Sequence, residues 1–411
     1  MQKNKHEQEN EMIAVGIDVS KGKSTVALLS DTGEVLKKPY DVSHTSLALS
    51  DLAKLIRDCK DDICVVMEAT GNYHKPIANY LCENGISVSV VNPKLIRDFS
   101  DNTLRKPKTD KKDAMKICRY ALTYRAELPD YSPENDARSA LKILNRQYSL
   151  AEKTLTMHKN LLISYLELVF PEVNKMFTSH IRDSDGHEKW IDFLVRFPHA
   201  DMVAKISLSE FRLKYKNWCK SAKYRFCESK AEVLHQFARE CVCASQNDEE
   251  IRFLVKEQAK MVNNLLEHMQ NIRTKMDEIA QTLPEYDTVV KMYGLGSTLS
   301  VQMMAEVGDV RRFKNRRAIT AYFGYDSETD QSGTHESKSN PMTKKGSPYL
   351  RRTLFLVMVA HMQTQPDNAV YQFLDKKRSE GKNYYSYMTA GSAKFLRIYY
   401  SKVKKVMEQI T

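Results

Sequence analysis

The sequence predicts an α/β domain at its N-terminus, a long helical coiled-coil region in the middle and a mainly α domain at its C-terminus. Short β-branched runs alternate with helical runs over the first 125 residues. Apolar residues then recur every three or four positions through two long stretches, and the last third alternates helical runs with polar loops. For 411 residues we expect two or three domains, here 1–128, 129–284 and 285–411.

The first domain begins with strands and continues as alternating helices and strands. Three strands joined by tight turns are predicted over residues 12–19, 24–30 and 34–42. The elements predicted next are a helix over 46–59, a strand over 63–68, a helix over 73–85 and a strand over 86–92. A three-stranded meander followed by βαβ units is the order of an RNase H-like sheet, whose fourth and fifth strands run parallel to the first.

Two long amphipathic helices are predicted in the middle region, one ending near residue 170 and one over about 249–282. Ser132 and Pro133 form a good N-cap and first-position pair for the earlier helix. The spacing fits an antiparallel coiled coil or dimerisation arm, and it fits an ordinary helical-bundle core equally well. Residues 171–248 between the two helices are predicted only to be mostly helical.

Composition narrows the class of partner. Lys and Arg number 63 against 52 Asp and Glu, and the difference, 63 − 52 = +11, favours a polyanion such as nucleic acid. The longest apolar run, residues 354–360, is far short of the roughly 20 residues that span a membrane. The polar N-terminus has no signal-peptide core, and the eight cysteines contain no CxxC pair. We therefore expect a cytoplasmic protein with reduced thiols and no membrane partner.

Four carboxylates predict a metal site. Asp18 lies inside an apolar strand, where an acid is costly unless it is paired or binds a cation, and Glu68 ends the fourth strand. Asp110 and Asp113 are three residues apart at a helix N-terminus, although such acids also simply complement a helix dipole. Carboxylates without histidine suit Mg²⁺ or Mn²⁺, the ions that serve phosphoryl transfer. Actin-like ATPases and sugar kinases also open with a Gly-Ile-Asp strand, but they need Gly-rich loops, and this chain has no Gly-Gly pair.

Several motifs resemble bacterial insertion-sequence transposases related to the Piv-type DNA invertases. The N-terminal motifs, typical of a RuvC-like "DEDD" domain, are Gly-Ile-Asp-Val-Ser-Lys (16–21), Met-Glu-Ala-Thr-Gly-Asn-Tyr-His (67–74), Val-Asn-Pro (91–93) and Lys-Thr-Asp-Lys-Lys-Asp-Ala (108–114). The C-terminal motifs lie at 294–296, 305–309, 312–314, 321–324, 331–334, 344–346 and 350–352. The resemblance covers about 12–125 and 285–400. It departs at Tyr293, where the family has Pro, and at Tyr325-Asp326-Ser327, where the family has Leu-x-Pro.

The resemblance implies a bacterial, nucleoid-associated recombinase of mobile DNA. In such proteins the acids matching Asp18, Glu68, Asp110 and Asp113 bind the catalytic metal, and the serine matching Ser332 joins covalently to DNA. A structured RNA from the element pairs with donor and target DNA. The resemblance also implies a dimer or tetramer, whose active site is shared between the RuvC-like domain of one protomer and the Ser-bearing domain of another.

Ser332 lies in a polar loop, so we expect its hydroxyl to be exposed, and a serine needs a base or metal nearby to become a nucleophile. A tyrosine nucleophile with a His-x-x-Arg motif is disfavoured, because no histidine is followed three residues later by arginine. Two alternatives stay open: a Holliday-junction-type nuclease that uses a metal-activated water, and a non-enzymatic nucleic-acid-binding protein.

Three basic clusters and one glycine turn are predicted to contact nucleic acid. Such contacts hold the phosphate backbone and do not read sequence. The predicted contact residues are Arg105, Lys106, Lys108, Lys111, Lys112, Gly294, Gly296, Arg311, Arg312, Lys314, Lys344, Lys345, Arg351 and Arg352. The Gly294–Gly296 turn could present backbone N–H groups to a phosphate, as helix-hairpin-helix motifs do. No helix resembles a base-reading recognition helix, which fits sequence choice by an RNA.

Overall fold

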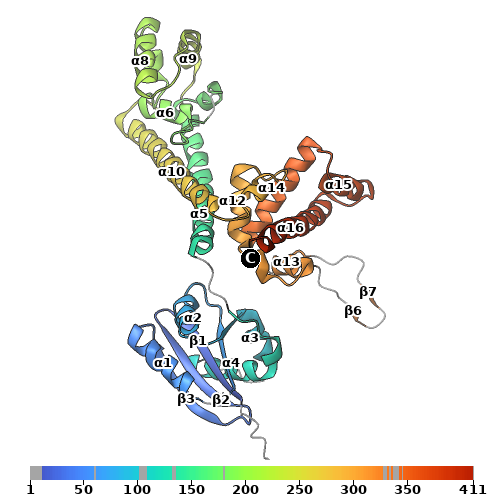
Figure 1. Cartoon of the computed structure of the whole chain (residues 1–411). Helices are drawn as coiled ribbons and strands as arrows, with labels where there is room; N and C mark the ends of the chain where they lie inside the picture. Colours follow the sequence, from blue (N-terminus) through green and yellow to red (C-terminus); the bar gives the residue numbers. More distant parts are fainter. Residues whose placement is uncertain are drawn as a thin grey trace, which may run out of the picture. The chain divides into compact units, whose positions relative to one another are not determined.

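The chain folds into two compact units, Met1–Asn135 and Asp136–Thr411, which we describe separately (Figure 1). The computed structural model describes residues 12–59, 62–100, 109–131, 136–178, 181–326, 331–332, 335–336, 342–344 and 346–410. The Ser132–Pro133 cap predicted for the long helix lies outside these residues.

A five-stranded sheet forms the centre of the first unit. The strands are β1 (Met12–Ser20), β2 (Lys23–Ser30), β3 (Val35–Ser43), β4 (Asp62–Glu68) and β5 (Val88–Val91). Their order is β3-β2-β1-β4-β5, with β1, β2 and β3 antiparallel and with β4 parallel to both β1 and β5. This is the RNase H-like arrangement that the sequence predicts, and the prediction is confirmed.

Helices cover both faces of the sheet. Alternate residues of β1 enter two different cores, because successive side chains on a strand point to opposite faces. Ile13, Val15 and Ile17 pack under α1 (Ser46–Asp58) and α2 (His74–Glu83). Ala14 packs on the other side, where the core includes residues of α3 (Pro93–Ser100) and α4 (Asp110–Tyr124). A short 3₁₀ turn, Arg125–Glu127, follows α4.

Two long helices run through the second unit: α5 (Asp136–Val169) and α10 (Glu249–Gln281). They pack antiparallel within one chain: Leu141 shares a core with Met276, and further along Gln258 bonds to His158. The two helices therefore pair with each other and also enter cores at their ends. The predicted division at residues 128 and 284 stays a prediction.

The segment between the long helices packs with the C-terminal half of α5 and the N-terminal half of α10 (Figure 1). Together they form a small helical core, which we call the middle core. Its elements are a 3₁₀ turn (Val173–Met176), α6 (Lys189–Arg196), α7 (Asp201–Ala204), α8 (Leu208–Ser221) and α9 (Glu228–Glu240). Aromatic side chains dominate, with Phe193 in ring contact with both Tyr215 and Trp218. The sequence indicated helices here, but it did not show that they pack on the long pair.

The C-terminal part packs around a third core. Its elements are α11 (Tyr286–Val290), α12 (Gly296–Val307), a 3₁₀ turn (Val310–Arg312), α13 (Arg316–Tyr322), β6 (Gln331–Ser332), β7 (His335–Glu336), α14 (Pro348–Thr364), α15 (Ala369–Ser379) and α16 (Tyr384–Glu408). Met303, Leu354 and Leu396 are fully buried in this core. Within the described ranges no helix is long and apolar enough to cross a membrane.

Candidate functional site: a carboxylate face and a serine hairpin

Two of the predicted metal ligands lie on one face of the sheet. Asp18 follows Gly16 by two residues in β1, and Glu68 follows Val66 by two residues in β4. Gly16 and Val66 both face α4. The parallel pairing of β1 and β4 runs up to the residues just before the two acids. With a side-chain period of two, Asp18 and Glu68 therefore share the α4 face at the carboxyl ends of neighbouring strands.

Gly16 allows α4 to lie directly on β1. A Cβ atom at this position would stand 2.3 Å from the carbonyl oxygen of Ala114 and 2.6 Å from the amide nitrogen of Cys118. The Gly16 N–H instead donates to Cys118 Sγ at 3.1 Å, and that thiol donates to the Ala27 carbonyl at 3.3 Å. Burial raises the pKa of Cys118 to about 12, which keeps the thiol neutral. The helix is thereby held at a fixed position over the strand.

The other two predicted ligands lie in the first turn of α4. Thr109 caps this helix by accepting a hydrogen bond from a first-turn backbone N–H. Asp110 precedes the buried Ala114 by four residues, and Asp113 precedes the buried Ile117 by four. Residues four apart share a helix side, so both acids lie on the side of α4 that packs against the sheet. All four carboxylates thus belong to the same face of the first unit.

A lysine–aspartate pair that the sequence reading missed lies at the same end of the sheet. Lys23 Nζ is 2.8 Å from Asp41 Oδ2, and Thr25 Oγ1 donates to Asp41 Oδ1 at 2.8 Å. Thr25 is the register partner of Asp18. The pKa of Lys23 is raised, mainly by its hydrogen bond to Asp41 and in smaller part by the charge of Asp110. Strand alternation in β2 and β3 was the signal that could have identified this pair.

The four acids fit a divalent cation in their chemistry and in the face they share, because hard cations prefer oxygen ligands. Within the described ranges, however, no three His, Cys, Asp or Glu side chains are grouped so that they could hold a metal ion. For these acids to hold one cation together, their side chains would have to move from the positions described here.

Ser332 belongs to a short hairpin. Its backbone forms β6, which pairs antiparallel with β7, with Ser332 opposite His335. The sequence predicted a polar loop here and did not predict the two-residue strands that pair within it.

Hydrogen bonds join the chain before the hairpin to the chain after it, and we call residues 324–326 and 343–344 the hairpin neck. The Thr343 N–H donates to the Asp326 carbonyl at 3.0 Å, and its hydroxyl donates to Asp326 Oδ1 at 2.7 Å. The Lys344 N–H donates to the Gly324 carbonyl at 3.3 Å. Asp326, one of the departures from the resembled family, therefore closes the neck.

A buried carboxylate, Glu306, ties this neck to two helices. Its Oε2 accepts a hydrogen bond from Ser347 Oγ at 2.6 Å, and its Oε1 accepts one from Asn145 Nδ2 at 3.0 Å. Arg146 Nε lies 3.7 Å from Oε1. Ser347 also caps α14, so one side chain joins α5, α12 and α14 beside the hairpin neck. Sequence reading had noted this acid only as part of a motif.

The glycine turn before α12 is anchored to α14. Gly294 and Gly296 have φ values of 85° and 55°, which favour glycine. The Tyr293 hydroxyl donates to Thr364 Oγ1 at 2.6 Å, so the residue that replaces the family's proline holds the turn. Gly296 is exposed, and next to it Ser297 accepts a hydrogen bond from Arg273 at 3.1 Å. Arg273 is a cation at this turn that the sequence reading missed.

Four of the predicted nucleic-acid contacts make internal contacts. Arg311 pairs with Asp309 at 2.7 Å, and Arg352 makes a two-pronged contact with Glu152 at 2.8 and 2.9 Å. Arg312 donates to a backbone carbonyl and lies over two aromatic rings, 4.7 Å from each ring centre. The Arg351 side chain donates to the backbone carbonyls of residues 323 and 346.

The remaining predicted cations divide into two groups. Lys111, Lys112, Lys314 and Lys344 have exposed side chains. Arg105, Lys106, Lys108 and Lys345 lie outside the described residues.

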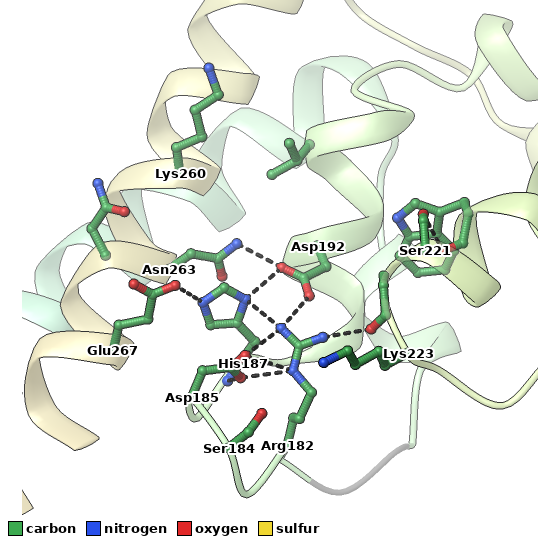
Figure 2. A pocket seen from close by; sticks show the side chains of 14 residues that line it. Arg182, Ser184, Asp185, His187, Asp192, Ser221, Lys223, Lys260, Asn263 and Glu267 are labelled. Carbon is green, nitrogen blue, oxygen red and sulfur yellow. Dashed lines mark hydrogen bonds and ion pairs between the residues drawn. The ribbon is translucent and has the colours of Figure 1, made fainter. Parts of the chain in front are cut away.

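A polar pocket of about 540 Å³ lies between α6, α8 and α10, in the helical core formed by the segment between the long helices (Figure 2). His187 is at its centre: Nδ1 lies 2.9 Å from Asp192 Oδ1, and Nε2 lies 3.0 Å from Glu267 Oε1. Burial lowers the pKa of His187, but the hydrogen bond to Asp192 and nearby carboxylates outweigh burial, so the pKa is raised.

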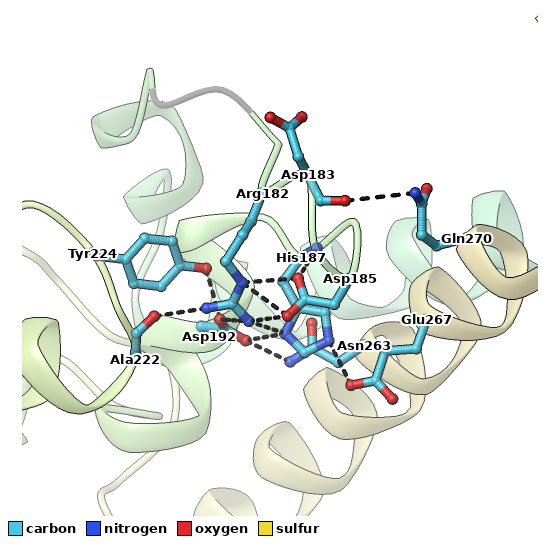
Figure 3. A network of polar contacts seen from close by, with 10 residues as sticks. All are labelled: Arg182, Asp183, Asp185, His187, Asp192, Ala222, Tyr224, Asn263, Glu267 and Gln270. Carbon is cyan, nitrogen blue, oxygen red and sulfur yellow. Dashed lines mark hydrogen bonds and ion pairs between the residues drawn. The ribbon is translucent and has the colours of Figure 1, made fainter. Parts of the chain in front are cut away.

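The groups around this pocket bond mainly to one another (Figure 3). Asp192 accepts hydrogen bonds from Asn263 Nδ2 at 2.7 Å and from the Tyr224 hydroxyl at 2.6 Å. Arg182 pairs with Asp185 at 2.7 Å and donates to a backbone carbonyl. Because these contacts join a loop, α6 and α10, the network holds the middle core together.

Two family models match the chain. One, a DEDD transposase model of the IS110 type described as "Transposase", matches residues 15–171. The other, described as "Transposase IS116/IS110/IS902 family", matches residues 286–372. Together they cover more than half of the chain and leave out the pocket in the middle core.

Curated relatives match over a shorter stretch. The "Pilin gene-inverting protein" of Moraxella bovis and that of Moraxella lacunata are each 27% identical over 135 residues. The matched stretch is 33% of this chain, and it covers 38% of each relative's length.

Solved structures match less than a third of the chain. Thermus thermophilus RuvC in complex with a Holliday junction substrate has a TM-score of 0.23 and 11% identity, covering 29% of this chain and 99% of that one. A further Thermus thermophilus RuvC structure has a TM-score of 0.24 and 11% identity, with 29% and 100% covered. The fold class rests on the strand order and register given above. The two family matches, in the order that the N- and C-terminal motifs predict, show that this chain belongs to the IS110 family of DEDD transposases.

Proposed function

We propose that this chain is a transposase or recombinase of a bacterial insertion sequence that cuts and rejoins DNA. It uses Mg²⁺ or Mn²⁺, a serine nucleophile and an RNA guide. The observation that carries the proposal is the shared face of Asp18, Glu68, Asp110 and Asp113, set by the close approach of α4 to Gly16. The alternative is a structure-selective nuclease that hydrolyses DNA with an activated water.

The acids hold the cation and so determine where a phosphodiester can bind. A divalent cation at this face would stabilise charge on the scissile phosphate. Asp18 and Glu68 are positioned by the sheet, while Asp110 and Asp113 are positioned by the packing of α4. The Thr25–Asp41–Lys23 chain of contacts orders the strand beside Asp18.

Ser332 is the proposed nucleophile. Its hydroxyl oxygen attacks the scissile phosphorus, the hydroxyl proton passes to solvent, and the bond from phosphorus to the leaving DNA oxygen breaks. A phosphoserine link results, and a 3′ hydroxyl later attacks the same phosphorus and releases the serine. The hairpin neck supports this role, because the Asp326–Thr343 contacts and the Glu306–Ser347 contact hold both ends of the segment that carries Ser332.

The family relationship supports DNA as the partner, and the resemblance supports an element-encoded RNA and a homodimer or homotetramer. RNA guidance gains further support from the chain's basic excess, because Lys and Arg contacts hold a phosphate backbone and do not read its sequence. For this part of the proposal, RNA that copurifies with the protein from cells should map to non-coding DNA flanking the gene. Recovery of bulk cellular RNA alone would contradict it.

Covalent capture tests the nucleophile. The protein is incubated with element-end RNA, DNA and Mg²⁺, denatured, and probed for DNA joined to protein. We expect an adduct with the wild type and with Ser209→Ala, and none with Ser332→Ala. An active wild type that forms no adduct would overturn the serine proposal. Normal cleavage by Ser332→Ala combined with none by Asp18→Asn would establish the nuclease alternative.

A further inference from the structure

A basic groove runs between α13 and α16. Two adjoining hollows, of about 360 and 660 Å³, form it and share Arg316, Ser401 and Lys405 in their linings. Eight cations line the hollows: Lys314, Arg316, Arg317, Lys394, Arg397, Lys402, Lys404 and Lys405. One acid, Glu408, lines them too. Of these cations, Lys314 is a nucleic-acid contact predicted from the sequence, and Arg316 and Arg317 belong to the same run of basic residues. The α16 wall lies beyond residue 372, where the second family match ends.

Helical periodicity builds the α16 wall. Arg397, Ser401 and Lys405 are four residues apart, and Lys394 and Lys402 flank them on the same side. The opposite side of α16 is buried through residues such as Leu396 and Tyr399. The groove therefore has a rigid wall on which the cations stand at regular intervals.

The charge in the groove is largely uncompensated. Lys404 lies 3.7 Å from Glu408. In the described part of the chain, Arg316, Arg397, Lys402 and Lys405 form no ion pair, and all four are exposed. Many like charges in one concavity repel each other, which raises the electrostatic energy of the groove. An anion with several charges in a row lowers that energy when it binds. A polynucleotide backbone is such an anion.

The lining distinguishes a duplex from a single strand. Proteins that bind single strands stack bases on exposed aromatic rings. The aromatic residue in this groove, Tyr400, is 4% exposed, and its hydroxyl donates to the Phe313 carbonyl at 2.9 Å. The groove thus offers cations for phosphates and no ring for bases. DNA is the polynucleotide on which the proposed function acts at every step.

We propose that the α13–α16 groove binds the backbone of double-stranded DNA, independently of its sequence. This inference rests on the proposed function only for the choice of DNA as the polyanion. Exposed cations without an ion pair in the described part of the chain, Arg316, Arg397, Lys402 and Lys405 among them, contribute most, because each can approach one phosphate without giving up an internal partner.

Binding by the full-length protein tests the groove. The variant carries Arg316→Gln, Arg397→Gln, Lys402→Gln and Lys405→Gln, and the charge-matched control carries Lys54→Gln, Lys153→Gln, Lys216→Gln and Lys220→Gln. Affinity for a random duplex of about 30 base pairs is measured against salt. Each lost phosphate contact reduces the slope of log K against log salt by about 0.9, so we expect a slope about 3 to 4 units shallower for the groove variant. Between about 50 and 200 mM salt, the wild type should then lose roughly 100-fold more affinity than the variant.

The control should keep the wild-type slope, and circular dichroism should show both variants folded. Equal losses in variant and control would overturn the proposal, because net charge alone would then explain binding. Loss of binding to an RNA hairpin with the duplex slope unchanged would overturn the assignment to DNA. The covalent-capture assay separates the two proposals: a wild type that forms adducts beside a groove variant with an unchanged slope refutes the groove alone. If the groove variant has the shallower slope but the wild type forms no adduct, the serine chemistry is refuted and the groove proposal stands.

Discussion

The backbone N–H of Gly16 in β1 donates to the thiol sulfur of Cys118 in α4 at 3.1 Å, so a helix backbone lies where a side chain would otherwise stand. This contact brings the first turn of α4, with Asp110 and Asp113, over the strand that carries Asp18. The shared face of the four acids therefore depends on residue 16 being a glycine, which has no Cβ atom to hold α4 away from β1.

Gly16→Ala should destabilise the first unit. The added Cβ would stand 2.3 Å from a backbone carbonyl, which cannot rotate away, and overpacking of this kind costs about 1–3 kcal/mol or more. Urea unfolding measures the loss. Gly16→Ala combined with Cys118→Ala should stay destabilised, because the clash with the Ala114 carbonyl remains. Full rescue by the double variant would show that only the thiol crowds this position.

Mg²⁺ should raise the unfolding temperature of the wild type, since a ligand that binds only the folded state stabilises it, by about 2.7 kcal/mol at 100 times its dissociation constant. Chelation should reverse the shift. Asp18→Asn should lose the shift, whereas Asp31→Asn, an exposed turn residue, should keep it. A shift that persists in Asp18→Asn would place the ion elsewhere.

Glu306→Ala should cost about 2–4 kcal/mol, because it leaves the buried Asn145 amide and the Ser347 hydroxyl without their acceptor. Glu306→Gln keeps an acceptor and should cost less. Chemical unfolding measures both variants, with the exposed Glu408→Ala as control. If Glu306 also positions the hairpin, Glu306→Gln should lower the rate of Ser332 adduct formation in the folded protein. An unchanged rate would limit Glu306 to a structural role.

The Arg138–Glu285 pair should behave as a buried ion pair. Arg138 Nη1 is 2.5 Å from Glu285 Oε1, and both side chains are buried. Removing one partner, as in Glu285→Ala, should cost about 3–5 kcal/mol, because a buried charge loses its partner. Arg138→Met combined with Glu285→Leu should recover most of that loss. A double variant less stable than either single variant would contradict this account.

The middle core should become less stable as pH rises, because the polar contacts of His187 then contribute less to its stability. The pKa of His187 is raised, so its contribution to stability is complete below its unfolded value of about 6.5 and is lost as pH rises through the higher folded value. The pKa of Asp192 is lowered despite its burial, by hydrogen bonds from His187 and Tyr224. Its contribution is present above about pH 3.9 and is lost as pH falls through the lower folded value.

Thermal unfolding at a series of pH values checks this. The wild-type unfolding temperature should fall between about pH 6 and pH 9, and His187→Gln should make that fall smaller. His268→Gln, at an exposed position on α10, is the control. The same downward slope in His187→Gln would assign the pH dependence to other groups.

Local patterns in the sequence determined the elements of the fold. The alternating apolar runs of β1 and β4 and the three-four spacing of α5 and α10 each mark an element, because strand and helix periods are properties of neighbouring residues. The parallel pairing of β1 and β4 also followed, since a meander before βαβ units allows few sheet orders. On that basis Asp18 and Glu68 could be placed at one sheet edge.

Tertiary structure decided which basic side chains remain available to contact nucleic acid. Arg312, Arg351 and Arg352 look like free cations in the sequence, yet each makes internal contacts. Arg397 and Lys405, unremarkable in the sequence, face a groove completed by α13.

The roles of Glu306 and His187 likewise follow from packing between distant segments: Asn145 lies 161 residues from Glu306, and Glu267 lies 80 residues from His187. Sequence periodicity tells which side of an element is buried. Only the packed chain determines which partner is found there, because hydrogen bonds and ion pairs depend on distances that local sequence does not encode.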